Sequence, residues 1–142
     1  MNYGEIKDVV RENFGRVGWP TVMLDYAMAC ARRQIENQGN YYWMKTSSTF
    51  NTVAATQDYP LLSGTINQPT FKDLRALHAK ETGSTFWQEL EVGVAALEDA
   101  RVSYGTTETS MPVIGVVNNV TLSLFHIPDA IYNMEIFFWE WT

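Results

Sequence analysis

Two histidines and one cysteine are the side chains in this sequence that are best suited to catalysis or metal binding. His78 and His126 lie far apart in the chain, and neither belongs to a His-x-x-x-His or Cys-x-x-Cys pattern that would place two ligands together. Cys30 stands between two alanines, where a small core residue is expected rather than a nucleophile. We therefore expect ordinary structural roles for all three side chains.

The motifs of nucleophilic and phosphate chemistry are also missing from the sequence. No serine lies in a Gly-x-Ser-x-Gly elbow, and no glycine-rich loop precedes a helix in a phosphate-binding pattern. The carboxylate pairs Glu89/Glu91 and Glu98/Asp99 are typical of the solvated face of a helix. We predict that the protein is not an enzyme and that it has no catalytic residue, no cofactor and no metal.

The composition is that of a single globular domain. The chain has 142 residues, of which 46% are hydrophobic and 13% aromatic, and a domain of this length buries about two thirds of its unfolded surface. Its one cysteine cannot form an internal disulfide, which fits a reducing compartment. No apolar stretch is long enough to span a membrane, and the charged N-terminus lacks the apolar core of a signal peptide.

The acidic charge of the chain is concentrated in its second half. The formal net charge of −6 lies entirely in residues 72–142, because acidic and basic residues balance in residues 1–71. Such a chain is a poor candidate for holding nucleic acid, since cations that contact phosphates supply most of that affinity. The charge fits a solubilising surface, or alternatively a wall that DNA passes without binding.

The first forty residues have the periodicity of two amphipathic helices. Asn2 followed by Glu5 resembles a capping box, and Pro20 suits the first residue of a second helix, which Gly39 would close. The two helices would form an antiparallel pair, each covering the other and part of a sheet. The apolar stripes are Tyr3, Ile6, Val10, Phe14 and Val17 in the first helix, and Leu24, Met28, Ala31 and Ile35 in the second.

The last thirty residues form three extended runs, 113–117, 120–127 and 130–141, which are joined by Asn118-Asn119 and Pro128-Asp129. Asn-Asn suits a two-residue hairpin turn, and Pro-Asp suits a second turn. The final run is apolar on both faces, with Phe137, Trp139 and Trp141 on one and Met134, Ile136 and Phe138 on the other. Because the sequence ends at Thr142, we expect one face to pack on the core and a partner to cover the other.

The middle of the chain adds shorter elements. Residues 47–53 are typical of a strand and residues 59–62 of an edge strand. Residues 71–80 fit a strand or a helix, and the Glu-Thr-Gly-Ser turn that follows favours the strand. A further helix is predicted near residues 85–101, and the aromatic cluster at 41–43 is expected in the core.

Together these elements predict an α+β fold, in which an N-terminal helical pair and a further helix pack on an antiparallel β-sheet or sandwich. We expect one domain over residues 1–142. Its helical part would occupy residues 1–40, and its mainly β part would occupy residues 41–142.

Three segments, in order along the chain, give the sequence a family resemblance. They are the helix that ends in the aromatic cluster (34–43), the run Thr-Val-Ala-Ala-Thr-Gln-Asp-Tyr-Pro-Leu at 52–61, and the proline, hairpin, Pro-Asp and tyrosine-strand succession from Met111 to Tyr132. In this order the chain resembles the head-to-tail adaptor proteins of tailed bacteriophages, whose members in short-tailed phages are called tail tubular protein A. The resemblance covers most of the chain, although each segment alone is a generic strand-and-turn pattern.

The resemblance implies a structural virion protein. Such adaptors form a ring, usually of twelve copies, below the portal of the capsid; they extend the channel through which DNA leaves and offer a surface on which the tail or nozzle protein assembles. The chain would be made in the host cytoplasm and reside in the virion neck, with no membrane contact and no specific DNA binding. It departs from longer members, which continue past the last strand, and from the usual second proline, since His126 and Ile127 precede Pro128.

Two other interpretations stay open. The chain could be a small β-rich domain that binds carbohydrate or peptide on its aromatic side chains, or another tail-end protein such as a stopper or terminator. Taken singly, each arginine is better explained as a solubilising surface charge, and the tryptophans could equally be core residues. The candidate residues for contacts with other subunits or partners are Arg11, Arg16, Arg32, Arg33, Phe137, Trp139 and Trp141.

Overall fold

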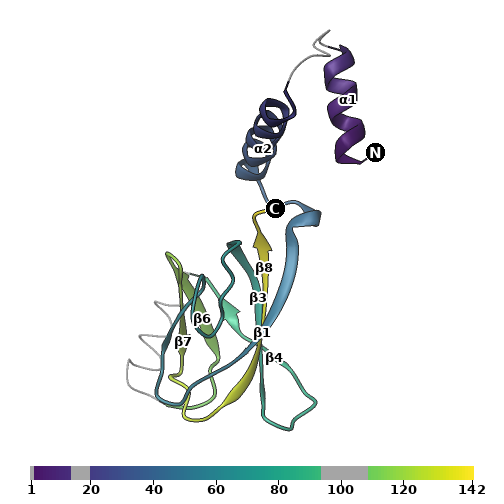
Figure 1. Cartoon of the computed structure of the whole chain (residues 1–142). Helices are drawn as coiled ribbons and strands as arrows, with labels where there is room; N and C mark the ends of the chain where they lie inside the picture. Colours follow the sequence, from purple (N-terminus) through teal and green to yellow (C-terminus); the bar gives the residue numbers. More distant parts are fainter. Residues whose placement is uncertain (1, 14–19, 94–108) are drawn as a thin grey trace. The chain divides into compact units, whose positions relative to one another are not determined.

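The computed structural model describes residues 2–13, 20–93 and 109–142 of the chain (Figure 1). These residues belong to two compact units, a helical unit at Met1–Asn40 and a β unit at Tyr41–Thr142. The predicted α+β class is confirmed, since the described elements are two α-helices, one short 3₁₀ helix and two sheets whose strands are mostly antiparallel.

The helical unit consists of α1 (Tyr3–Asn13) and α2 (Thr21–Gln38). The predicted capping box is confirmed: the Glu5 amide donates to Asn2 Oδ1 at 3.0 Å, and the Asn2 amide donates to Glu5 Oε2 at 2.7 Å. Pro20 is the residue before α2 rather than its first helical residue, and Gly39 follows the last. An ion pair between Lys7 and Asp25 at 2.5 Å links the two helices.

The predicted apolar stripe of α2 is wrong in part. Leu24 is buried and Met28 is half-buried, but Ala31 and Ile35 are exposed. The buried side chain near the end of the helix is instead the carboxylate of Glu36, which Arg32 and Arg33 of the same helix approach. Spacing alone therefore identified the helix but not the side chains that it buries.

The β unit is a sandwich of two four-stranded sheets (Figure 1). Every pair of neighbouring strands is antiparallel except β5 and β6, which are parallel. The first sheet has the order β1 (Lys45–Asn51), β8 (Tyr132–Glu140), β3 (Phe71–Glu81) and β4 (Gln88–Glu89), and the second has the order β2 (Asp58–Pro60), β7 (Thr121–Phe125), β6 (Ile114–Asn118) and β5 (Glu91–Val92).

The predicted hairpin near residue 118 is confirmed, but its turn lies one residue further along. Asn118 pairs with Thr121, so Asn119 and Val120 make the turn between β6 and β7. Asn119 has a φ of 57°, a left-handed conformation that asparagine tolerates better than most residues. The strand favoured for residues 71–80 is likewise confirmed as β3.

The further helix predicted near residues 85–101 is wrong for the part of that range that the structure describes. Residues 88–89 and 91–92 are the short strands β4 and β5, and residues 94–101 lie outside the described range. Gly83, with a φ of 86°, turns the chain after β3 so that Glu89 pairs back onto His78. Phe86, near the start of that range, is 82% exposed. The hairpin turn therefore overrode a helical spacing of only a few residues.

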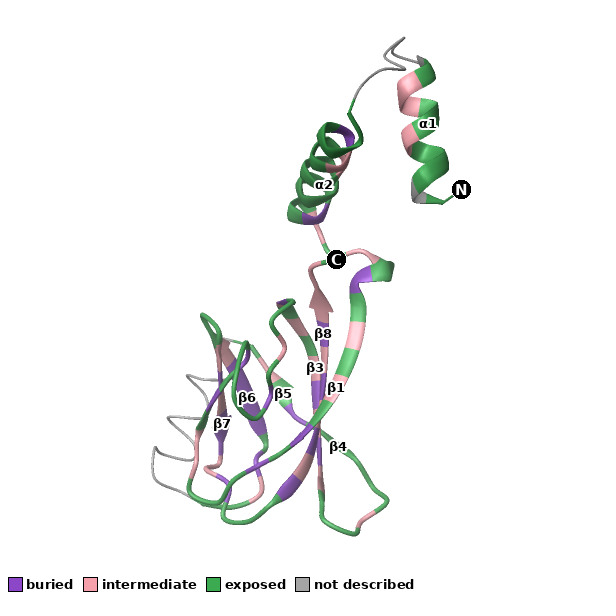
Figure 2. Cartoon of the chain, viewed as in Figure 1, coloured by how far each residue is buried: buried purple, intermediate pink, exposed green. Residues whose placement is uncertain are grey.

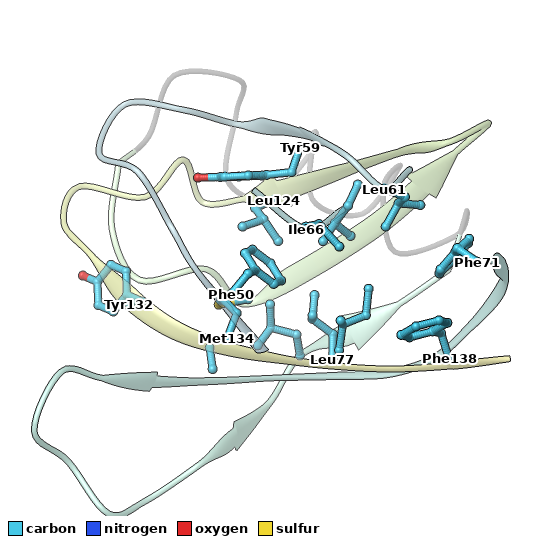
Figure 3. Close-up of a cluster of buried hydrophobic side chains, with 14 residues drawn as sticks. Phe50, Tyr59, Leu61, Ile66, Phe71, Leu77, Leu124, Tyr132, Met134 and Phe138 are labelled. Atoms are coloured by element: carbon cyan, nitrogen blue, oxygen red, sulfur yellow. The ribbon is translucent and has the colours of Figure 1, made fainter. Parts of the chain in front are cut away.

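The core lies between the two sheets (Figures 2 and 3). In the close-up, Phe50, Leu77 and Met134 of one sheet point toward Leu124 of the other and toward Ile66. The sheets approach closely at Gly115, where a Cβ atom would lie 2.5 Å from Leu77 Cδ2. The cluster consists of Phe50, Tyr59, Leu61, Ile66, Phe71, Leu77, Ala79, Leu90, Leu122, Leu124, Tyr132, Met134, Ile136 and Phe138.

The aromatic cluster at the start of the β unit is not the core feature that was predicted. Tyr42 is 84% exposed and Trp43 is 58% exposed, whereas Met44 is fully buried. These three residues form the 3₁₀ helix η1 (Tyr42–Met44), and the Trp43 ring stacks on Tyr41 with centroids 4.6 Å apart. A single turn of 3₁₀ helix before β1 turns most of the cluster toward solvent.

Candidate interface on the outer face of the first sheet

Strand β8 divides its side chains between two different environments. Met134, Ile136 and Phe138 point into the sandwich and are at most 1% exposed. Phe137 and Trp139 alternate with them and are only half-buried, as is Trp141 just beyond the strand. The prediction of two apolar faces on the last strand therefore agrees with the burial pattern of the strand.

The neighbours of these aromatic residues on β1 and β3 leave room on the outer face of the sheet. Phe137 lies in register between Ser47 of β1 and Ala76 of β3, which are both small. Trp139 lies beside Lys45 of β1. The ring of His78 contacts Phe137 from β3, with centroids 4.9 Å apart. Small and polar neighbours leave the aromatic rings partly open to solvent.

Positive charges cap the rings at one end of this face. The Lys45 ammonium lies 5.4 Å from the Trp139 ring centroid and 4.9 Å from that of Tyr42, and the Arg75 guanidinium lies 5.2 Å from Trp139. Lys72 lies 4.7 Å from the ring centroid of Trp141. Each such contact contributes about 0.5–1 kcal/mol at a partly exposed site. We call this set, with Tyr42, Lys45, Lys72, Arg75, Trp139 and Trp141 as its members, the cation–aromatic cluster.

The cluster contains three of the four cations in the described part of the β unit. Within residues 41–93 and 109–142, the lysines and arginines are Lys45, Lys72, Arg75 and Lys80, and each lies over an aromatic ring. Among the residues that the structure describes, no carboxylate oxygen lies within 4.0 Å of the charged nitrogens of Lys45, Arg75 or Lys80. These cations are paired with rings of the same face and can still attract an external anion.

The arginines predicted as contact residues make contacts inside the helical unit. Arg11 lies 3.3 Å from Asp8 and donates a hydrogen bond to the Thr21 hydroxyl at 2.9 Å. Arg32 and Arg33 lie 4.0 and 3.9 Å from the Glu36 carboxylate. Arg16 lies outside the described residues. Arg32 and Arg33 therefore lie beside a buried carboxylate, and Arg11 joins α1 to the first residue of α2.

The residues that carry the family resemblance tie one corner of the sandwich together. The Thr52 hydroxyl donates to the carbonyl of Ala130 at 3.0 Å and accepts the amide of Tyr132 at 2.8 Å. The Ala55 amide donates to the carbonyl of Pro128 at 2.8 Å. The Tyr132 hydroxyl donates to Asp129 Oδ1 at 2.5 Å. The Pro-Asp-to-tyrosine spacing thus holds the entry of β8 against the end of β1.

A second tyrosine of these segments closes the neighbouring turn. The Tyr59 hydroxyl accepts the Val53 amide at 3.0 Å and donates to the carbonyl of Thr56 at 3.0 Å. Burial raises the pKa of Tyr59, and the hydrogen bond from Val53 partly opposes this shift. The hydrogen bond to Asp129, followed by burial and by the charges of Asp129 and Glu81, raises the pKa of Tyr132 to about 12. Both hydroxyls therefore stay protonated and act as structural ties.

The side chains considered for catalysis have other surroundings. His78 packs on Phe137, His126 is half-buried, and Cys30 is exposed rather than in the core as predicted. Across residues 2–13, 20–93 and 109–142, no group of three His, Cys, Asp or Glu side chains is arranged to hold a metal ion. Neither of the described α-helices is long and apolar enough to cross a membrane.

The cations of the cluster were not among the residues predicted from the sequence. Lys72 and Arg75 lie at irregularities of the β3–β8 register, where the alternation of faces is interrupted. The face of the sheet on which each side chain lies could therefore not be predicted from strand periodicity. Lys45 lies opposite Trp139 only through the pairing of β1 with β8, and the sequence alone does not show that pairing.

No protein-family model matches the chain, and the search of curated proteins found no match.

Proposed function

We propose that this chain is a structural subunit of a phage head-to-tail adaptor ring, which lies between the portal and the tail and extends the DNA exit channel. The observation that carries the proposal is the outer face of β8, where Phe137, Trp139 and Trp141 remain half-buried beside the cations of the cluster. Aromatic and arginine side chains are the residues most enriched in interface hot spots.

Charge complementarity supports a contact between copies. Acidic residues outnumber basic ones in residues 41–142, whereas the two balance in residues 1–40. Away from the cluster, the β unit exposes the carboxylates of Asp58, Glu81, Glu91 and Asp129. If the cation–aromatic cluster of one copy docks on the acidic surface of the next copy, the contact joins two different patches of the protein. Repetition of this contact around an axis closes a ring.

The same excess of acidic residues suits a channel for DNA. A wall with few unpaired cations binds phosphates weakly, so DNA passes without being held. The three cations of the cluster, Lys45, Lys72 and Arg75, are directed into contacts between subunits, and they are thereby removed from the path of the DNA. The helical unit, whose α2 exposes Val22, Met23 and Tyr26, supplies apolar surface for the portal side of the ring.

The test is assembly on the portal of the same phage. The purified chain is mixed with the portal ring and examined by electron microscopy, with the portal alone and the chain alone as controls. The proposal predicts an added ring of density at one end of the portal. A stopper or terminator would instead bind an adaptor or a tail tube and leave the portal bare. Failure to decorate the portal end-on would contradict the proposal.

A further inference from the structure

A hollow of about 320 Å³ lies on the outer face of the first sheet, apart from the cation–aromatic cluster. The residues that line it are Thr49, Phe50 and Asn51 of β1, Asn133 and Met134 of β8, Lys80 of β3, and Trp87 just before β4. Phe50 and Met134 also belong to the buried core. Its volume is at the lower end of the range of small-molecule sites. Outside these two core residues, the lining combines uncharged polar groups with the indole of Trp87 and the ammonium of Lys80.

The polar groups of the hollow have hydrogen-bonding capacity to spare. Asn133 Nδ2 donates to Asn51 Oδ1 at 2.9 Å across the β1–β8 pair. This bond leaves the Asn51 amide nitrogen as a donor and the Asn133 amide oxygen as an acceptor, side by side. Neither these two atoms nor the Thr49 hydroxyl has a further partner among the described residues. Adjacent donors and acceptors of this kind match the paired hydroxyls of a sugar.

Trp87 and Lys80 supply the other two elements of sugar recognition. The Trp87 side chain is 40% exposed, so part of the indole is free to pack against the apolar C–H face of a pyranose ring. The Lys80 ammonium lies 4.6 Å from the centroid of the Trp87 ring. No carboxylate of the described residues lies within 4.0 Å of it. The nearby carboxylates are Glu135, in register with Thr49, and Glu89, in register with His78. Lys80 is thus the one cation that lines the hollow.

We propose that this hollow binds a saccharide unit that carries a carboxylate, as in a uronic acid. The pyranose ring packs on Trp87, its carboxylate pairs with Lys80, and its hydroxyls bond with Asn51, Asn133 and Thr49. A neutral sugar would keep the packing and the hydroxyl bonds but lose the charged contact. Saccharide binding in this hollow does not depend on assembly of the subunits into a ring, and that assembly does not depend on saccharide binding.

The test is a titration of the isotope-labelled full chain with an oligomer of galacturonic acid, followed by nuclear magnetic resonance. The expected result is a dissociation constant of about 1 mM, with shifts at the Trp87 indole N–H and at the side-chain amides of Asn51 and Asn133. An oligomer of galactose should bind about tenfold more weakly, since the charged hydrogen bond is lost.

Three substitutions and a matched control make the test specific. Trp87→Ala and Asn133→Ala should abolish the shifts, and Lys80→Gln should make the acidic and neutral oligomers bind equally. Phe86→Ala is the control, because Phe86 is 82% exposed beside Trp87 but does not line the hollow. The absence of localised shifts, unchanged binding in Trp87→Ala, or equal binding of both sugars by the wild type would each overturn the proposal. None of these outcomes bears on portal decoration.

Discussion

Both faces of β8 carry large apolar residues, but these residues have opposite environments on the two faces. On the inner face, Ile136 and Phe138 are at most 1% exposed and belong to the core of the sandwich. On the outer face, Phe137 and Trp139 are half-buried, and cations rather than aliphatic side chains lie over the Trp139 ring. The difference shows that hydrophobicity alone does not say whether an aromatic residue stabilises the fold. The surroundings of the ring decide its role. The second sheet covers the inner face, whereas small and charged side chains of β1 and β3 lie beside the rings of the outer face.

The largest expected effect comes from the inner face. Phe138→Ala should lower the free energy of unfolding by about 3–5 kcal/mol, since it removes a fully buried ring that packs against Phe71. Urea denaturation followed by circular dichroism measures the change. Phe137→Ala, one residue away on the outer face, is the matched control and should cost less than about 1.5 kcal/mol. Equal losses in the two variants would erase the distinction between the faces.

The next effect concerns assembly rather than folding. Trp139→Ala should weaken association between copies by about 2 kcal/mol or more, because it removes the ring that Lys45 and Arg75 both cap. Sedimentation velocity over a range of protein concentrations measures this change. Ile131→Ala, at an exposed residue just before β8, should assemble like the wild type. A Trp139 variant that associates normally would remove the outer face from the interface.

A smaller loss is expected where the two sheets meet. Gly115→Ala should cost about 1–3 kcal/mol, since its methyl group would lie 2.5 Å from Leu77 Cδ2 and Leu77 is fully buried. The loss is read from the midpoint of thermal unfolding. Double substitution with Leu77→Ala should recover part of it by making room. An unchanged or raised midpoint for Gly115→Ala would contradict the close approach of Gly115 to Leu77 and would mean that the two sheets are less tightly packed there.

The smallest effect is a pH dependence at the start of β8. Because the pKa of Tyr132 in the folded protein is raised from 10.0 to about 12, the protonated hydroxyl contributes stability that is fully present below pH 10. This contribution is lost as the pH rises through about 12. Tyr132→Phe should therefore lose less stability than the wild type between these values, as measured by urea denaturation at each pH.

The control for this prediction is Tyr59→Phe, whose native tyrosine also has a raised pKa but lacks a carboxylate partner. Its effect on the pH dependence should be smaller than that of Tyr132→Phe. Identical alkaline profiles for the wild type and Tyr132→Phe would show that the hydrogen bond to Asp129 does not set the titration.

Much of the fold could be predicted from the sequence because local signals and burial agreed. The capping box at Asn2 and Glu5, the hairpin near Asn119 and the two-faced run of β8 each combine turn chemistry with a clear period. The helix predicted near residue 85 was wrong in its described part because helical spacing over a short segment is a weak signal, and Gly83 could reverse the chain into a hairpin.

The candidate interface could be predicted only in part, for a different reason. The aromatic residues of β8 follow the period of a strand, so their shared face was visible in the sequence. Lys45, Lys72 and Arg75 come from strands more than fifty residues away, and two of them lie at register irregularities of β3. Cross-strand contacts of this kind depend on sheet order and register, which a single sequence does not state.

The central claim is that the outer face of β8 becomes buried when copies assemble. Hydroxyl-radical footprinting with mass spectrometry tests it directly, by comparing side-chain oxidation rates in the free chain and in the portal-bound ring, with the exposed Phe86 as the internal reference. The account predicts that Trp139 and Trp141 become several-fold less reactive on assembly while Phe86 stays unchanged. Oxidation of both tryptophans at the same rate in the free chain and in the ring would contradict it.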